Sequence, residues 1–382
     1  MKKIFAILMA LALCAAGGFG AFAAQDPADA GLKFHNGVFT IIQVSDLQQI
    51  YVSSPATHEF LWDLAAREQP DLFVLTGDNI ADAWVRTLTH RTAKFWVRRS
   101  IDAYMDVFDR IYDQYGTKVT MVFGNHDAEG SGVTRAEEME MYQAHRSFVG
   151  YDCGADTGSP GDHYGAHNLL IKNSSGSQFV YHLWFFDTGG PACDGVRKPA
   201  IDWFNRTNRA VGKLPSLAFQ HIIVPEIWDA LPKGQKAGQP LPASIKGVMR
   251  ETPCNNAEND GQYEALRKAG NVKALFVGHD HVNTYEIRRE GMPDLVNSPS
   301  SGFGAYGDLD LRGVRLIRLR EDDLSDYQTE VITYLDFYQK NDPEGWLRVL
   351  RLAANNSLKN FGIVPDILFF IPALWVVRAI AR

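Results

Sequence analysis

Polar side chains of the kinds that bind metal ions follow five apolar runs of this chain, close to the point where each run ends. Asp46 ends the run at 38–45, and Asp78 follows the run at 71–76. The full set of candidates is Asp46, Gln48, Asp78, Asn125, His126, Asp127, His221, His279 and His281. Carboxylates, amides and imidazoles, without a set of thiolates, suit Mn, Fe or Zn at a functional site rather than structural zinc.

The local sequences differ in how strongly they indicate this chemistry. Gly-Asn-His-Asp at 124–127 is weak evidence by itself, since Gly-Asn is also common in turns. A lone His221 in an apolar run would more often be a satisfied core histidine. Gly-His-Asp-His at 278–281 is stronger, because two imidazoles around an acid rarely serve packing. The prediction of a metal site therefore depends on the ends of all five apolar runs lying close together in space.

Predicted strands and helices alternate along the chain. Strand-like apolar runs lie at 38–45, 71–77, 118–124, 216–223 and 272–278. Apolar residues at helical spacing lie at 56–69, 91–115, 134–149, 200–212 and 262–270. This rhythm favours a parallel sheet with helical crossovers, and in such a sheet ligands bind outside the carboxyl ends of the strands. Glycines at 77, 124 and 278 allow the sharp turns that would face the next side chains toward that edge.

The second half of the chain indicates a further sheet. Strands at 167–173 and 179–187 are separated by Ser-Ser-Gly-Ser, which is turn composition, and two more are predicted at 312–320 and 328–336. Residues 232–260 are rich in Gly, Pro, Asn and Gln and predict a long surface loop. The elements together predict an α/β sandwich of two sheets, the second of them mixed.

These motifs resemble those of the calcineurin-like metallophosphoesterases, and within them the purple-acid-phosphatase-like branch, over residues 38–320. The matching elements are Asp46-x-Gln48, Gly77-Asp78, Gly124-Asn125-His126-Asp127, His221 and Gly278-His279-Asp280-His281. The resemblance implies a four-layer αββα sandwich with two mixed β-sheets and two divalent or mixed-valence metal ions. Asp78 would bridge both ions, and Asp46 and His281 would hold the first. The second ion would be held by Asn125, His221 and His279.

Two positions depart from the family pattern. The first motif is normally Asp-x-His, whereas this chain has Gln48. A neutral amide oxygen is a weaker ligand than imidazole for a late transition metal, so Gln48 either weakens the first site or points away and leaves a gap for water. The tyrosine that binds ferric iron in purple acid phosphatases is replaced by Ala81, so no iron–tyrosinate colour is expected.

The resemblance implies hydrolysis of phosphate monoesters or diesters by a hydroxide that bridges the two metals. His126 would protonate the leaving oxygen or stabilise its charge. Asp127 would orient His126 or cap the following helix, and Asp280 would support a ligand histidine or face solvent. The alternative function, motivated by Gln48, is a weakened metal- or phosphate-binding protein of the same fold.

The two ends of the chain predict an export signal and a helical tail. Residues 1–23 combine Lys2 and Lys3, an apolar run and an Ala-Phe-Ala cleavage pattern, which predicts a signal peptide and a periplasmic or extracellular protein. Its removal takes two lysines and no acid, so the net charge would go from −7 to −9, which argues against a general binder of nucleic acids or anionic surfaces.

The catalytic domain is expected at 36–336 and the helical tail at 337–382. The tail has an apolar face at Trp346, Leu347, Leu350 and Ala353 and an apolar stretch at 367–377 that is too short to span a bilayer. It would pack on the domain or contact a membrane peripherally. Among Cys153, Cys193 and Cys254 one disulfide is plausible, with the pairing open.

Overall fold

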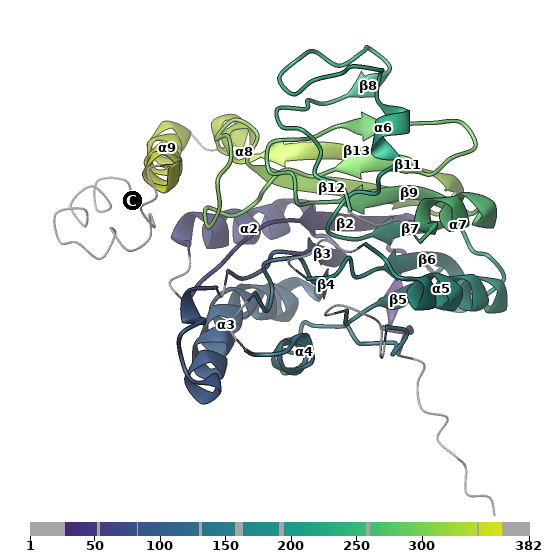
Figure 1. The fold of residues 1–382 in the computed structure, drawn as a ribbon, viewed down its shortest axis with the longest axis horizontal. Coiled ribbons are helices and arrows are strands. Elements are labelled where there is room, and N and C mark those ends of the chain that lie inside the picture. The colour runs from purple at the N-terminus through teal and green to yellow at the C-terminus, as the bar shows by residue number, and fades with distance from the viewer. Residues whose placement is uncertain are drawn as a thin grey trace, which may run out of the picture.

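The computed structural model describes residues 27–51, 54–81, 83–129, 132–156, 163–190, 195–256, 260–341 and 344–360. The expected signal peptide, Cys193 and the apolar stretch at 367–377 lie outside these residues. Figure 1 shows four layers, from left to right helices, a first sheet, a second sheet and further helices. The predicted α/β sandwich with two mixed sheets is confirmed.

The first sheet has five strands in the order β13-β12-β2-β3-β4. Its strands are β2 (Val38–Val44), β3 (Leu72–Thr76), β4 (Lys118–Val122), β12 (Gly313–Arg320) and β13 (Asp323–Thr333). β2, β3 and β4 are parallel, whereas β12 pairs antiparallel with both β2 and β13. Three of the predicted ligand-bearing runs therefore end at the same edge of one sheet.

The second sheet has eight strands in the order β1-β5-β6-β7-β9-β11-β10-β8. Its long strands are β5 (His167–Lys172), β6 (Phe179–Phe185), β7 (Ser216–Phe219), β9 (Val272–Val277) and β11 (Asp294–Asn297). The short strands β1 (Leu32–Lys33), β8 (Ile245–Lys246) and β10 (Glu286–Ile287) complete it. β6, β7, β9 and β11 are parallel, so β7 and β9 bring the remaining ligand-bearing runs to a common edge.

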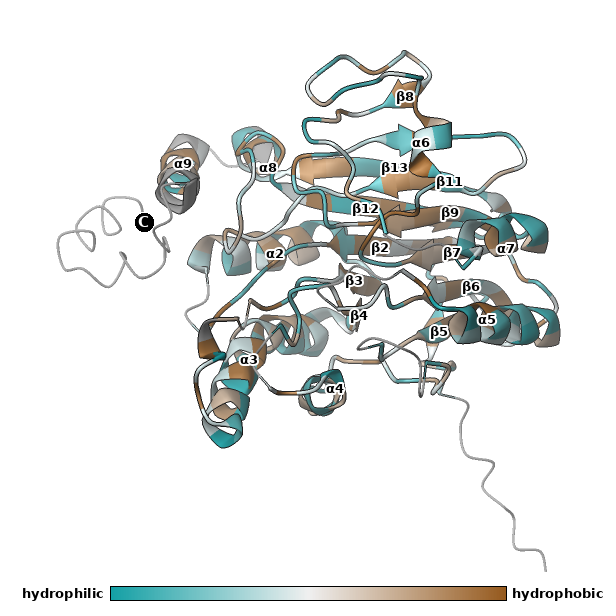
Figure 2. Cartoon of the chain, viewed as in Figure 1, coloured by the Kyte–Doolittle hydropathy of each residue, from teal (hydrophilic) through white to brown (hydrophobic). Residues whose placement is uncertain are grey.

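Helices cover the outer face of each sheet. α2 (Pro55–Glu68), α3 (His90–Tyr115), α4 (Arg135–Gln143), α8 (Tyr334–Asn341) and α9 (Gly345–Asn360) lie on the side of the first sheet. α5 (Lys198–Ala210) and α7 (Gln262–Ala269) lie outside the second sheet. The short α6 (Ile227–Ala230) and the 3-10 turn η1 (Ala83–Val85) lie in loops. Figure 2 shows brown strands inside and teal outward faces on the helices.

Alternation along the strands builds the core. In β2, Phe39 and Ile41 join the apolar cluster between the two sheets, while Ile42 and Val44 join the cluster under α2 and α3. Side chains of a strand point alternately to its two faces, so a strand covered on both sides must be apolar throughout. This explains why the continuous runs in the sequence became interior strands.

Caps set several helix boundaries. Thr134 and Glu137 form a capping box at the start of α4, and Gly116 ends α3 in the left-handed conformation with φ 75°. The predicted helix at 134–149 is too long, because α4 ends at Gln143. Residues 334–336, predicted as strand, begin α8 instead.

The described part of the tail contacts the domain through ion pairs. Arg348 lies 2.7 Å from Asp63 of α2, and Arg351 pairs with Glu59. On the predicted apolar face, Leu347 and Ala353 are half-buried and Leu350 is 60% exposed, whereas Leu352, beside that face, is buried. Within the described residues, no helix combines the length and apolar character needed to cross a membrane. Cys153 and Cys254 are free thiols.

Candidate metal centre

The predicted ligands converge at the shared edge of the two sheets. Asp46 follows β2, Asp78 follows β3, and Asn125 follows β4. His221 comes two residues after β7, and His279 two residues after β9. Two sets of donors each lie within 4.8 Å of one another, namely Asp46 with Asp78 and His281, and Asp78 with His221 and His279. Asp78 belongs to both sets, which is the arrangement expected of a bridging ligand.

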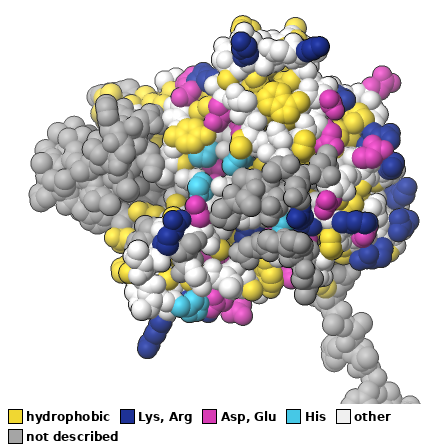
Figure 3. Space-filling view, in the orientation of Figure 1, with side chains coloured by type: hydrophobic (Ala, Val, Ile, Leu, Met, Phe, Trp, Pro, Cys, Tyr) yellow, Lys and Arg dark blue, Asp and Glu magenta, His cyan; other side chains and the backbone are white. Residues whose placement is uncertain are grey.

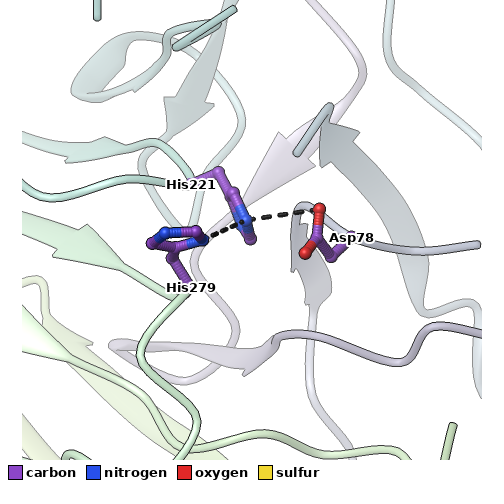
Figure 4. Close-up of side chains that lie close together, drawn as sticks. All are labelled: Asp78, His221 and His279. Atoms are coloured by element: carbon purple, nitrogen blue, oxygen red, sulfur yellow. Dashed lines mark hydrogen bonds and ion pairs between the residues drawn. The ribbon is translucent and has the colours of Figure 1, made fainter. Parts of the chain in front are cut away.

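Asp78 faces His221, which lies between Asp78 and His279 in Figure 4. Its Oδ1 lies 3.3 Å from Nε2 of His221 and accepts a 2.8 Å hydrogen bond from the backbone N–H of His126. Nδ1 of His279 lies 3.2 Å from the same His221 nitrogen. Asn125 Oδ1 is 3.1 Å from it as well. Four potential ligands from four loops therefore surround one point.

Backbone carbonyls orient two of the imidazoles. His221 Nδ1 donates to the carbonyl of Thr76 at 2.8 Å, and His281 Nδ1 donates to the carbonyl of Tyr306 at 2.9 Å. In each ring this leaves Nε2 directed at the carboxylates, since His281 Nε2 lies 3.3 Å from Asp46 Oδ1. Such carbonyl partners fix the tautomer and ring orientation of metal-binding histidines.

The donor set fits a cation at the first site. Asp46 is completely buried, and its Oδ1 faces the imidazole nitrogens His281 Nε2, 3.3 Å away, and His221 Nε2, 4.0 Å away. Its Oδ2 is satisfied by the Ser45 hydroxyl and by the backbone N–H of His279. When His281 Nε2 carries no proton, this buried oxygen has no donor, which is costly, and a bound cation would satisfy the oxygen and the nitrogen together.

Gln48 lies beside the cluster rather than away from it. Its side-chain nitrogen donates to Asp78 Oδ2 at 3.3 Å. The nitrogen end of the amide therefore contacts the carboxylate that both donor sets share. The first site then keeps three of its expected ligands, Asp46, Asp78 and His281.

Asp127 does not contact His126, so the expectation that it orients this histidine is wrong. Its carboxylate accepts 3.0 Å hydrogen bonds from the backbone N–H groups of Asn79 and Ile80 and a 2.7 Å bond from that of Gly124. It therefore ties the loop after β4 to the loop after β3. The alternative role, helix capping, is also wrong, because α4 is capped by Thr134.

The residue that contacts His126 is Glu129, which sequence reasoning missed. Its Oε2 lies 2.5 Å from His126 Nδ1. His126 Nε2 then faces the cluster, 3.9 Å from Asp78 Oδ2. A carboxylate three residues after a histidine is a common pattern, so spacing alone carried no signal for this contact.

Asp280 takes neither of its two expected roles. It is buried and accepts hydrogen bonds from the backbone N–H of Cys254 at 3.1 Å and from the side chain of Asn283 at 3.3 Å. It thereby fixes the loop around Cys254 against the turn that carries His279 and His281.

The ionisation of the cluster follows from burial and mutual charge. Burial alone would raise the pKa of Asp78, but the charges of His221 and His126 hold it well below its usual range. Burial would lower the pKa of His221, yet Asp78 and Asp46 raise it to about 10. Burial, with the neighbouring His221, lowers the pKa of His279 to about 4. In the metal-free chain His221 therefore carries a proton, which a cation would displace.

The centre opens into a cavity of about 430 Å³. It is lined by Gln48, Asp78, His126, Glu251, Thr252, Cys254, His279, Asp280, His281, Ala305 and Tyr306. The ring of Tyr306 stacks on His281 with centroids 4.1 Å apart, and its hydroxyl donates to Glu251 at 2.6 Å. Figure 3 shows histidine side chains in cyan gathered near the middle of this face, beside acidic ones.

The backbone around the ligands is tightly constrained. A Cβ on Gly124 would lie 2.2 Å from Asp78 Oδ1, so only glycine fits there. Asp46, Asp78 and His279 have φ angles of 53°, 50° and 67°. These angles lie in the left-handed region, which residues other than glycine adopt much less often. Such strain clusters at functional sites.

Comparisons with known proteins agree with this geometry. The family model described as calcineurin-like phosphoesterase matches residues 39–283. The chain is 28% identical over 313 residues to probable inactive purple acid phosphatase 29 of Arabidopsis thaliana, covering 71% of this chain and 74% of that protein. It is 26% identical over 317 residues to phosphatase DCR2 of Saccharomyces cerevisiae, covering 72% and 50%.

Among solved structures, a dimetal phosphatase from Danio rerio matches with a TM-score of 0.48 and 14% identity, over 77% of this chain and 98% of that one. The family model covers more than half of the chain, from the first strand of the first sheet to the turn that carries the last two histidines. The chain therefore belongs to the calcineurin-like phosphoesterase family.

Proposed function

We propose that this protein hydrolyses phosphate esters at a centre that holds two metal ions. The observation that carries the proposal is the meeting of two buried carboxylates and three imidazoles from four strand ends, with one carboxylate shared by both donor sets. Asp46, Asp78 and His281 would hold one ion. Asp78, Asn125, His221 and His279 would hold the other. Carboxylate and imidazole donors favour Mn, Fe or Zn.

When bound, such ions would supply Lewis-acid activation of a water and of the phosphoryl oxygens. The chain itself supplies His126, which faces the cavity and would give a proton to the leaving oxygen. Glu129 holds the opposite nitrogen of the ring, so that Nε2 is the atom presented to substrate. Burial would lower the pKa of His126, but the charges of Asp78 and Glu129 raise it, which favours the protonated form that an acid needs.

A second candidate is a binding protein of the same fold that turns over no ester. Two observations favour it: position 48 holds an amide, whose nitrogen donates to Asp78, where the family has an imidazole, and three relatives are named probable inactive purple acid phosphatases. Such a protein would bind one metal firmly, or a phosphate group, without hydrolysis.

Turnover of p-nitrophenyl phosphate and bis-p-nitrophenyl phosphate, measured with Mn, Fe and Zn in turn, separates the two candidates. We expect metal-dependent hydrolysis that falls by roughly 10²-fold or more in Asn125→Ala and His126→Ala. His35→Ala is the matched control, because this exposed histidine pairs with Asp71, outside the cavity lining. No turnover with any metal, together with one bound ion per chain, would favour the binding protein.

We further propose that the protein is exported, on the signal pattern of residues 1–23. Its substrate would then be a small phosphate ester outside the cytoplasm. Mass spectrometry of the mature N-terminus tests the cleavage, which we expect after Ala23. Peripheral membrane contact through the tail at 337–382 is a separate proposal, and deletion of residues 361–382 tests it.

A further inference from the structure

Positive charge is concentrated at one end of α3. Residues 83–101 contain five lysine or arginine side chains and no carboxylate, in a chain whose net charge is −7. Two of the five are paired, since Lys94 lies 2.8 Å from Glu137 and Arg86 lies 3.8 Å from Glu129. The other three, Arg91, Arg98 and Arg99, are exposed. No carboxylate of the described residues lies within ion-pair distance of them.

The stability of the helix does not explain this distribution. The first turn of α3 has no acid and its last turn no base. The carboxylates of the helix, Asp102, Asp106, Asp109 and Asp113, lie from its midpoint onward. The helix dipole favours acids near the N-terminus and bases near the C-terminus, so α3 carries its charges in the opposite sense. Cations placed against the dipole without partners point to an external anion.

Apolar side chains are exposed among these arginines. Phe95 is 56% exposed and Leu88 is 37% exposed. Arg91, Phe95, Arg98 and Arg99 recur at spacings of four, seven and eight, which places them on one face of the helix. The ring of Phe95 packs edge-on against Trp96, with centroids 5.2 Å apart, so it is held in a defined position while its outer side faces solvent. We call Leu88, Arg91, Phe95, Arg98 and Arg99 the α3 patch.

The patch lies on the same side of the molecule as the metal centre. α3 begins after the loop that follows β3, at the edge of the sheet that carries Asp78. Contacts link the two regions, because Arg86 lies near Glu129 and Glu129 contacts His126. Figure 3 shows cationic and apolar side chains below and to the left of the central histidines, over α3.

We propose that the α3 patch docks on an anionic lipid bilayer. Arginines beside an aromatic ring match the head-group region, where cations meet lipid phosphates and aromatic rings sit between the polar and apolar layers. An exposed leucine adds aliphatic surface that favours lipid over a polynucleotide. The negative charge of the whole chain is compatible with this, because the attraction acts over about one Debye length and is set by the nearest charges. Docking would hold the mouth of the cavity beside the head groups.

Co-sedimentation of the full chain with vesicles tests the proposal. One set contains phosphatidylcholine alone, and the other contains added phosphatidylglycerol. We expect binding that needs phosphatidylglycerol and weakens with salt. Each cation near an anionic bilayer contributes roughly a fivefold gain in affinity, so the triple variant Arg91→Gln/Arg98→Gln/Arg99→Gln should bind on the order of a hundredfold more weakly. Phe95→Ser should also weaken binding, at unchanged charge.

The matched control is Arg206→Gln/Arg209→Gln/Lys213→Gln, which removes three exposed cations at and just after the C-terminal end of α5. It should bind like the wild type. Equal losses in both triple variants would reduce the effect to net charge and overturn the proposal. Wild-type affinity in the α3 variant would assign vesicle binding to another segment and also overturn it. The proposal would also be overturned if the wild type bound a DNA oligonucleotide through the α3 patch and did not bind vesicles. None of these results depends on turnover, so they stand apart from the proposed hydrolysis.

Discussion

Replacing Glu129 tests how this centre positions its proposed acid. Glu129 is the hydrogen-bond partner of His126 on the side away from the cavity, with 2.5 Å between Oε2 and Nδ1. In Glu129→Ala the ring loses this partner and can rotate, so that Nε2 spends less time facing the cluster. In Glu129→Gln an amide oxygen can still accept the hydrogen bond, but the negative charge is gone.

The size of the effect follows from the role of an outer partner. General acid catalysis contributes roughly 10²–10⁴-fold, and loss of a residue that orients a functional histidine typically costs about 10–100-fold. We expect kcat to fall by about 10–100-fold in Glu129→Ala, equivalent to about 1.4–2.7 kcal/mol of barrier, and by less in Glu129→Gln. KM should change little, because Glu129 does not line the cavity.

The pH profile of kcat gives a second readout. Burial lowers the pKa of His126, whereas Asp78 and Glu129 raise it. An acid works in its protonated form, so activity is lost as pH rises through this pKa. Removing the charge of Glu129 should move the alkaline limb to lower pH. Glu140→Gln, an exposed change on α4, is the control and should leave the limb in place.

If Glu129→Ala keeps the wild-type kcat and the alkaline limb of its pH profile does not move, Glu129 does not position His126. Asp127→Ala provides the contrast. It removes the acceptor of three backbone N–H groups and should lower the free energy of unfolding by about 3–5 kcal/mol. A stability loss in Glu129→Ala as large as this would mean that Glu129 acts through the fold and not through His126.

Three further outcomes can be measured. Gln48→His should raise the bound metal per chain, read by elemental analysis after dialysis; unchanged stoichiometry would contradict our reading of this position. Gly124→Ala should lower metal affinity at least about tenfold in titration calorimetry, because its Cβ would press against Asp78 Oδ1. Burial lowers the pKa of His167 to about 4 and of His182 to about 3, so the unfolded chain binds more protons below pH 6.5. Stability should fall by about 2 kcal/mol per histidine between pH 7 and pH 5 in urea titrations, and His182→Gln should remove about half of that loss.

The sequence predicted the ligand-bearing strands because these strands are buried on both faces. A short, continuously apolar run such as 272–277 is typical of an interior strand. The glycine that follows it marks the turn after which a side chain can face the edge of the sheet. The short strands were missed for the opposite reason. β8 and β10 have two residues each and form only because the loops around them are held together by distant contacts.

The roles of individual residues around the centre were harder to predict. Asp127 is next to His126 in the chain, but the turn directs its carboxylate back at the backbone of Asn79 and Ile80. Glu129 reaches the imidazole because the intervening residue, Ala128, has φ 63° and bends the chain back. Tyr306 comes from a loop far along the sequence, and its stacking on His281 has no local signature. Such contacts are set by tertiary geometry.

The left-handed backbone at Asp46, Asp78 and His279 lowers the stability of the fold in exchange for the position of these three side chains. Each such residue costs about 1–3 kcal/mol that the rest of the fold must offset. Glycine at position 78 would relax the chain while deleting the shared carboxylate, so a laboratory selection for heat resistance alone should favour a more stable protein that lacks the proposed metal centre. Retention of these aspartates under such selection would indicate that they stabilise the folded chain, as they would by binding the proposed metal ions.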